Sequence, residues 1–165
     1  MDNMKNEQGK NYSYTYEDGK RVRFLGRAAE RRVESEILNL GINVFVPSID
    51  DGVDLVTEFG DRIQVKASRN QYSNTRGYKY PCYIFVTRKK KYVSATGKTI
   101  RAKIKPGSID FLICWGVEDD VFFIIPEYDI TTSIVKIPIN KLGRESKYAK
   151  YINAWHLLKD RKGVD

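Results

Sequence analysis

The chain has 165 residues and carries 29 Lys and Arg against 21 Asp and Glu, a formal net charge of +8. A chain of this length can bury roughly 70% of its unfolded surface as one domain, so its core needs no disulfide or metal. We expect a disordered tail at 1–11 and a single domain at 12–165, with its core at about 23–159. Every apolar run is far too short to span a membrane, so we expect a soluble cytoplasmic protein with no membrane partner.

The cysteine and histidine content excludes several kinds of site. Cys82 and Cys114 each lie in an apolar run, which predicts small buried side chains in a reducing compartment. Two separated cysteines and one histidine cannot build a Cys/His zinc site. A Cys-His or Ser-His-Asp nucleophile would have to recruit His156, which we expect to be a packing or edge residue instead.

The N-terminal segment alternates aromatic and polar residues from Tyr12 to Tyr16 and alternates again from Lys20 to Phe24. The Asp18-Gly19 pair between them is a turn signal. We therefore predict an N-terminal β-hairpin over these two runs.

A helix is predicted from Gly26 to Leu40, because apolar residues recur there at helical spacing and Gly41 follows the last of them. A second helix is predicted at about 144–159, with an apolar stripe that includes Tyr148 and Trp155. Strands are predicted at 42–46, 53–58, 62–68, 80–87, 109–115 and 121–125, with a possible edge strand at 134–139. The segment from Arg88 to Gly107 is predicted to be a basic loop.

Charge is strongly segregated along the chain. From Arg62 to Ile109 there is no Asp or Glu, and 13 of the 29 cations lie in this stretch, which leaves 16 cations against 21 acids elsewhere. Such a block is the electrostatic footprint expected for a polyanion, and tyrosines interleaved with the cations suit nucleic acid. We predict that nucleic acid binds through these cations: Arg69, Arg76, Lys79, Arg88, Lys89, Lys90, Lys91, Lys98, Arg101, Lys103 and Lys105.

The most informative motif joins an acidic turn to two strands. Asp54 lies between Val53 and Leu55, where an unpaired carboxylate is costly unless a cation neutralises it. In the next strand, Gln64 and Lys66 share one face while their apolar neighbours share the other. The arrangement can hold a divalent metal, although the same spacing also arises by chance in a charge-rich chain.

Four segments in this order resemble the PD-(D/E)XK nuclease superfamily: Gly26 to Val33, Gly41 to Pro47, Asp51 to Val56 and Ile63 to Lys66. The resemblance covers about Arg23 to Lys159. This chain has Gln64 where most of the superfamily has a second acidic residue. In this respect its motif resembles that of the branch that contains a cyanobacterial group I intron homing endonuclease. The resemblance implies an α/β fold, with a central mixed β-sheet flanked by helices in a restriction-endonuclease-like core, to which the N-terminal β-hairpin is an extension.

The resemblance also implies roles for individual residues. Asp54 would be the metal-binding aspartate, Gln64 would take the place of the second acidic ligand, and Lys66 would be the motif lysine. Glu30 matches a first-helix glutamate that reaches the metal directly or through water, and the Val65 backbone carbonyl would be a further ligand. The implied ion is Mg²⁺, with Mn²⁺ as a substitute, since these hard ions prefer oxygen ligands.

The function expected from these features is a metal-dependent endonuclease that hydrolyses phosphodiester bonds of DNA, with duplex DNA as the partner. Cutting both strands calls for two sites, so a homodimer or homotetramer is expected. One alternative is a catalytically inactive nucleic-acid-binding module on the same fold. Another is an RNA-processing nuclease or an RNA binder, which charge does not distinguish from a DNA enzyme.

Overall fold

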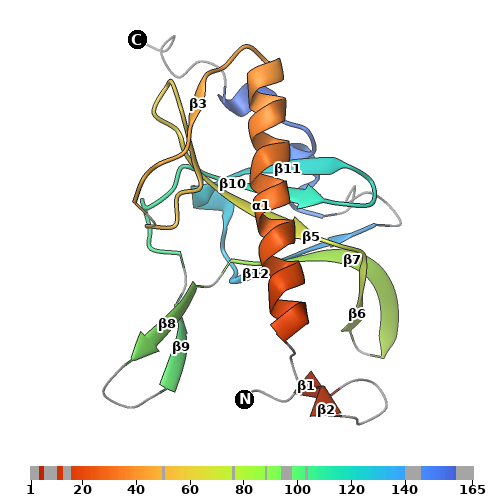
Figure 1. The fold of residues 1–165 in the computed structure, drawn as a ribbon. Helices are drawn as coiled ribbons and strands as arrows, with labels where there is room; N and C mark the ends of the chain where they lie inside the picture. The colour runs from red at the N-terminus through yellow and green to blue at the C-terminus, as the bar shows by residue number, and fades with distance from the viewer. Residues whose placement is uncertain are drawn as a thin grey trace.

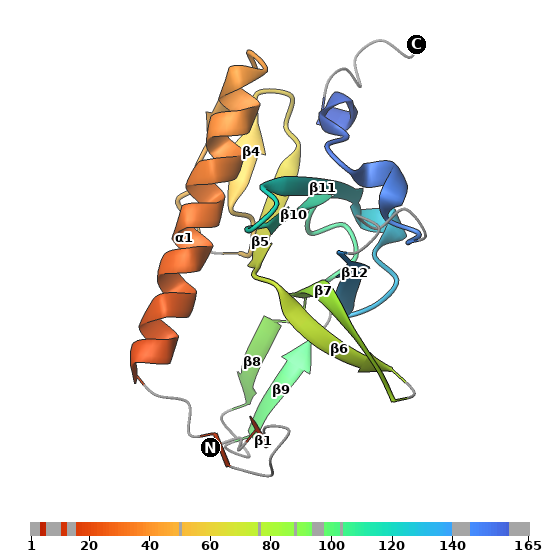
Figure 2. The ribbon, with the colours of Figure 1, turned by 90° about the vertical axis from the view of Figure 1, so that its right-hand side faces the viewer.

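The fold is built on a five-stranded mixed sheet that carries one long helix on one face and a second sheet on the other (Figures 1 and 2). The computed structural model describes residues 4–5, 11–12, 16–49, 51–75, 77–87, 89–93, 98–102, 104–139 and 146–158. None of the helices within these residues is long and apolar enough to cross a membrane.

The central sheet places one of its two most apolar strands directly beside the strand that carries the Gln-x-Lys motif. In sheet order its strands are β11 (Val121–Pro126), β10 (Phe111–Gly116), β5 (Arg62–Ser68), β4 (Leu55–Thr57) and β3 (Val44–Phe45). β10 runs parallel to β5, and the other pairs are antiparallel. The predicted central mixed sheet of an α/β fold is therefore confirmed.

A three-stranded antiparallel sheet covers the face of the central sheet away from the helix. Its order is β12 (Ile134–Pro138), β7 (Tyr78–Val86) and β6 (Gln71–Thr75), so β12 is an edge strand as predicted. Two small strand pairs complete the structure: β1 (Met4–Lys5) with β2 (Asn11–Tyr12), and β8 (Lys89–Val93) with β9 (Lys98–Ala102).

Alternation along β10 divides the core into two layers. Phe111 and Ile113 belong to the cluster beneath the helix, while Leu112 and Cys114 belong to the cluster beneath the three-stranded sheet. Because both faces are covered, the strand reads as an unbroken apolar run. Cys114, like Cys82, is a buried free cysteine, as the sequence predicts.

Helix α1 spans Tyr16–Asn39, ten residues further toward the N-terminus than predicted. The predicted hairpin strands at 12–16 and 20–24 are therefore wrong, because 20–24 lies inside α1. A short N-terminal hairpin is present instead between β1 and β2. Alternation of apolar and polar residues indicates a strand only where one face of the strand is buried. The side chains at 20–24 are all exposed, so their alternation does not indicate a strand.

The predicted closing helix at 144–159 is also wrong, within the part of it that the structure describes. Two 3-10 turns occur there, η2 (Ala149–Tyr151) and η3 (Trp155–Leu158). Between them Asn153 has a positive φ of 47° and exchanges hydrogen bonds with Phe122 of β11, through both its backbone N–H and its side-chain oxygen. This attachment to the sheet interrupts the helical pattern, although the stripe residues Tyr148 and Tyr151 are still buried.

The predicted basic loop at 88–107 contains the antiparallel pair β8–β9, in which Lys90 is the register partner of Arg101. Strand β6 was likewise not predicted. The β8–β9 segment and β6 are strongly polar and show little alternation of apolar and polar residues. Their strand structure therefore depends on the strand with which each one pairs more than on their own sequence. Figures 1 and 2 show β8–β9 extending toward the same end of the molecule as the start of α1.

Candidate active site

Asp54 is fixed against β5 by both its backbone and its side chain. Its backbone N–H donates to the carbonyl oxygen of Ile63 at 2.8 Å, and its Oδ2 accepts from the backbone N–H of Val65 at 2.7 Å. The preceding turn depends on Gly52, whose φ of 96° favours glycine, and on Asp51, whose Oδ1 accepts the Val53 N–H at 3.0 Å. The Asp-Gly turn signal therefore positions Asp54 at the edge of the site.

Gln64 lies next to this anchor and is only 3% exposed. Its Nε2 donates to the carbonyl oxygen of Gly52 at 3.2 Å. Since a carbonyl can only accept, this contact assigns the nitrogen, and Oε1 points elsewhere. Oε1 is buried and has no hydrogen-bond partner among the residues that the structure describes. A buried acceptor without a hydrogen-bond donor lowers the stability of the folded state, and a bound cation would remove that cost.

Glu30 reaches this region from α1. Burial, followed by the negative charge of Asp54, raises the pKa of its carboxyl, while Arg27, Arg31 and Lys66 act in the opposite direction. Glu30 is therefore coupled electrostatically to Asp54 and to Lys66, although the three residues come from one helix, the turn before β4, and β5. Lys66 is partly buried, and its positive charge acts on the Glu30 carboxylate.

These residues fit a hard divalent ion. No group of three His, Cys, Asp or Glu side chains suited to a metal occurs within the described ranges. The site offers instead two carboxylates, from Glu30 and Asp54, and the free amide oxygen of Gln64. The Val65 carbonyl is on the same strand. Mg²⁺ takes oxygen ligands of these kinds and keeps several waters, so such a mixed set meets its requirements.

The polar face of β5 is less open than its sequence suggests. Gln64 and Ser68 are each 3% exposed, whereas Lys66 is partly exposed. The cause is the second sheet, because Ser68 Oγ accepts the backbone N–H of Ile84 in β7 at 2.9 Å. Sequence alternation identifies the face but cannot anticipate that another sheet packs on it.

The predicted nucleic-acid-binding residues fall into three groups. Arg69, Lys79 and Lys105 are exposed, with Arg69 in a 3.4 Å ion pair with Glu118 and Lys79 lying 5.8 Å from the ring centroid of exposed Tyr72. Five others lie on the backbone of β8 and β9: Lys89, Lys90, Lys91, Lys98 and Arg101. The remaining three, Arg76, Arg88 and Lys103, are outside the described residues.

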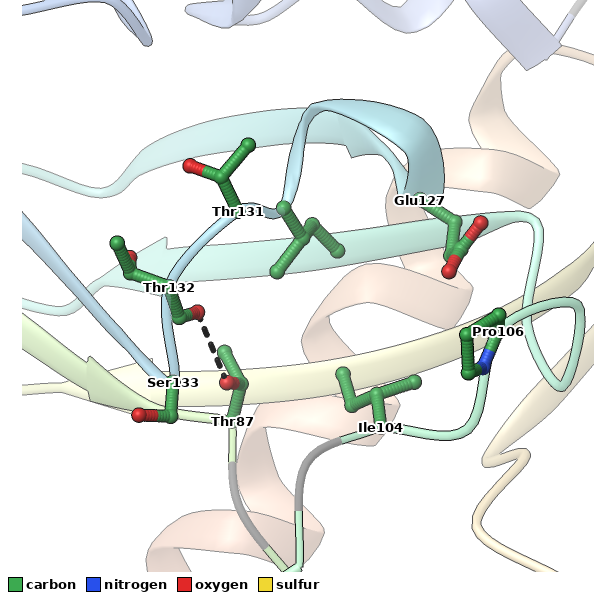
Figure 3. A pocket seen from close by; sticks show the side chains of 8 residues that line it. Thr87, Ile104, Pro106, Glu127, Thr131, Thr132 and Ser133 are labelled. Carbon is green, nitrogen blue, oxygen red and sulfur yellow. Dashed lines mark hydrogen bonds between the residues drawn. The ribbon is translucent and has the colours of Figure 1, made fainter.

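A pocket lies apart from these residues, at the base of the β8–β9 pair (Figure 3). Its volume is about 160 Å³, and hydroxyl groups dominate its polar lining, with Thr87 Oγ1 donating to the Thr132 carbonyl at 3.4 Å. Glu127 is the acidic residue in its wall. Because the wall contains none of Glu30, Asp54 and Lys66, it is not the candidate active site.

One residue that supports the site was not predicted. Asp110 Oδ2 accepts the backbone N–H of Arg62 at 2.9 Å and its Nε at 3.1 Å, which ties the start of β5 to the residue before β10. Its position directly after the long acid-free block is a signal that could have found it.

Comparison with known proteins agrees with this geometry. The family model described as PD-(D/E)XK endonuclease matches residues 21–158. Among solved structures, a bacterial homing endonuclease, I-Ssp6803I, is similar with a TM-score of 0.66 and 23% sequence identity, over 83% of this chain and 92% of that one. No curated protein matches. The described fold agrees with a restriction-endonuclease-like architecture, and nucleases of this family generally depend on a divalent metal. The chain belongs to the PD-(D/E)XK endonuclease family.

Proposed function

We propose that the protein is a divalent-metal-dependent DNA endonuclease that uses Asp54, Gln64, Lys66 and Glu30. The observation that carries this proposal is the buried Oε1 of Gln64, which has no hydrogen-bond partner among the described residues and lies near the anchored carboxylate of Asp54. A polar atom kept without a partner in the interior is expected at a functional site more than in a structural core.

The proposed ligands are Asp54, Gln64 Oε1, the Val65 carbonyl and Glu30, with Mg²⁺ as the ion and Mn²⁺ as a substitute. A divalent ion at such a site supplies Lewis-acid stabilisation of the charge on the scissile phosphate and makes water more acidic. The Asp54 carboxylate keeps its orientation because Val65 N–H holds one of its oxygens.

Lys66 acts on the reacting phosphate. In hydrolysis a water oxygen forms a bond to phosphorus, one P–O ester bond breaks, and the leaving oxygen takes up a proton. Negative charge grows on the phosphate oxygens during this exchange, and an ammonium group held beside the site offsets it. Partial burial of Lys66 strengthens that effect, since water screens the charge less.

Duplex DNA is the proposed substrate, because the family is one of endonucleases and because basic residues extend from β5 through β9. Two sites are needed to cut both strands, so we propose that a homodimer or homotetramer acts on the DNA.

The test is cleavage of supercoiled plasmid with Mg²⁺, with Mn²⁺ and with EDTA. We expect nicked or linear product only with metal, and at least a roughly 10²-fold slower reaction for Asp54→Ala and for Lys66→Ala. Lys147→Ala is the matched control, since Lys147 contacts Thr131 at 2.6 Å on the exposed surface and takes no part in the site. Circular dichroism checks that each variant is folded.

Three outcomes separate the alternatives. Cleavage by Asp54→Ala and Lys66→Ala at the wild-type rate would show that the site is elsewhere. Duplex binding without cleavage in either metal would favour the non-catalytic binding module. Preferential cleavage of RNA over duplex DNA would favour the RNA-processing alternative.

A further inference from the structure

The first half of α1 extends away from the core. Its described side chains from 17 to 28 include none that is buried, whereas Ala29, Val33 and Ile37 in the second half are at most 1% exposed. Figures 1 and 2 show this half of the helix continuing past the central sheet, at the end of the molecule where β8 and β9 also lie. A helical half with no fully buried side chain gains little stability from the core, so contact with a partner would explain its length.

Cations line one side of this exposed half. Each residue turns an α-helix by about 100°, so Lys20, Arg23 and Arg27 fall within about 60° of one another. Arg23 and Glu30 are seven residues apart and lie within about 20° of each other around the axis. The row formed by Lys20, Arg23 and Arg27, here called the α1 cation row, therefore leads along the helix toward the candidate active site.

The α1 cation row differs from the arginines that follow it. Arg31 forms an ion pair with Glu34, and Arg32 forms ion pairs with Glu36 and Asp120. Within the part of the chain that the structure describes, no acidic side chain forms an ion pair with a member of the row. Lys20 lies 5.9 Å from the ring centroid of Phe24, an interaction that leaves its charge uncompensated.

We infer that the α1 cation row binds the backbone phosphates of duplex DNA next to the phosphate that is cut. Lys20 and Arg27 are seven residues apart, or about 10 Å along the helix axis, which corresponds to about three base-pair steps at 3.4 Å each. Three exposed cations with no acid among them complement a phosphate backbone, and they are continuous with the site through Arg27, whose charge acts on Glu30. This inference rests on the proposed function, because it takes the cut phosphate to lie beside Glu30 and Asp54.

The test measures duplex binding in EDTA by fluorescence anisotropy over a range of salt concentrations, so that cleavage plays no part. The triple variant Lys20→Gln, Arg23→Gln, Arg27→Gln keeps good helix formers and removes the three charges. The slope of log K against log salt is negative, and slopes are compared here by magnitude. We expect the slope to fall by about 2.7, or about 0.9 for each phosphate that is no longer neutralised, with affinity at least about tenfold weaker near 0.1 M salt.

Arg21→Gln is the matched control. Arg21 is an exposed cation of the same half-helix, but it lies about 120–160° around the axis from Arg23 and Arg27. We expect it to change the slope by less than about 0.3, because a charge that does not touch a phosphate releases no counterion. Should the triple variant fail to fold, Arg23→Gln and Arg27→Gln alone should each lower the slope by about 0.9.

The two proposals fail in different ways. A slope unchanged in the triple variant, or lowered as much by Arg21→Gln, would overturn the α1 cation row while leaving metal-dependent cleavage intact. Cleavage at the wild-type rate in the variants of Asp54 and Lys66 would overturn the proposed site, and a lowered slope in the triple variant would then still support a phosphate-binding row.

Discussion

The backbone N–H of Val65 and Oδ2 of Asp54 are joined by a 2.7 Å hydrogen bond that ties the turn before β4 to β5. The same bond holds the carboxylate in one orientation relative to β5. The carboxylate therefore has a structural role and a proposed catalytic role, which two substitutions can separate.

Asp54→Asn retains an oxygen that can accept the Val65 N–H, whereas Asp54→Ala leaves that N–H without a partner. We expect both to abolish metal-dependent cleavage, but only Asp54→Ala to lose about 1–3 kcal/mol of unfolding free energy through this bond. Urea denaturation in EDTA measures the difference. Equal stability of the two variants would show that the bond contributes nothing.

Gln64→Glu tests whether the free amide oxygen faces a cation. Without metal the change should lower the melting temperature, because a further carboxylate would be buried near those of Asp54 and Glu30 and the donor to Gly52 would be lost. With metal the added charge should strengthen binding, so Mg²⁺ should raise the melting temperature more than it does in the wild type. Equal metal-induced shifts would remove Gln64 from the ligand set.

Glu30 should make stability depend on pH. Burial and the charge of Asp54 raise its pKa above the ordinary value of 4.5, so the folded state holds this proton more tightly than the unfolded state. Its contribution to stability is thus fully present below pH 4.5 and is lost as the pH rises through the raised pKa.

Glu30→Gln removes this dependence. In EDTA we expect the variant to gain stability relative to the wild type between acidic and neutral pH, as measured by urea denaturation at several pH values. Glu34→Gln is the control on the same helix, since Glu34 pairs with Arg31 and has no part in the site. A difference between Glu30→Gln and wild type that does not vary with pH would contradict this electrostatic account.

Ser68 joins the two sheets, because its Oγ accepts the Ile84 N–H at 2.9 Å and donates to the Arg69 carbonyl. Ser68→Ala leaves the Ile84 N–H without that acceptor, and we expect a loss of about 1–3 kcal/mol in unfolding free energy. Chemical denaturation measures it. Ser35→Ala, on the exposed side of α1, should change stability by no more than about 0.5 kcal/mol.

The sequence by itself determined the strands whose pattern of apolar residues reflects burial in the core. Strand β5 occurs at Arg62–Ser68 as predicted, and the apolar runs of β10 and β11 are within two residues of their predicted bounds. It also predicted Asp54, Gln64 and Lys66 as one group, and the structure bonds Asp54 to Val65, which lies between the other two in β5. Burial on both faces leaves little freedom in such segments.

Tertiary structure decided the features that no local sequence pattern predicts. It extended α1 back to Tyr16 across exposed residues, replaced the closing helix with turns where Asn153 bonds to Phe122, and paired β8 with β9 in the basic segment. Only the fold could show that Gln64 Oε1 is buried with no hydrogen-bond partner among the described residues, and that α1 continues through Arg23 and Arg27 as an exposed half-helix. The physical reason is that hydrogen-bond satisfaction and charge proximity depend on segments far apart in the chain, whereas periodicity records only the next few residues.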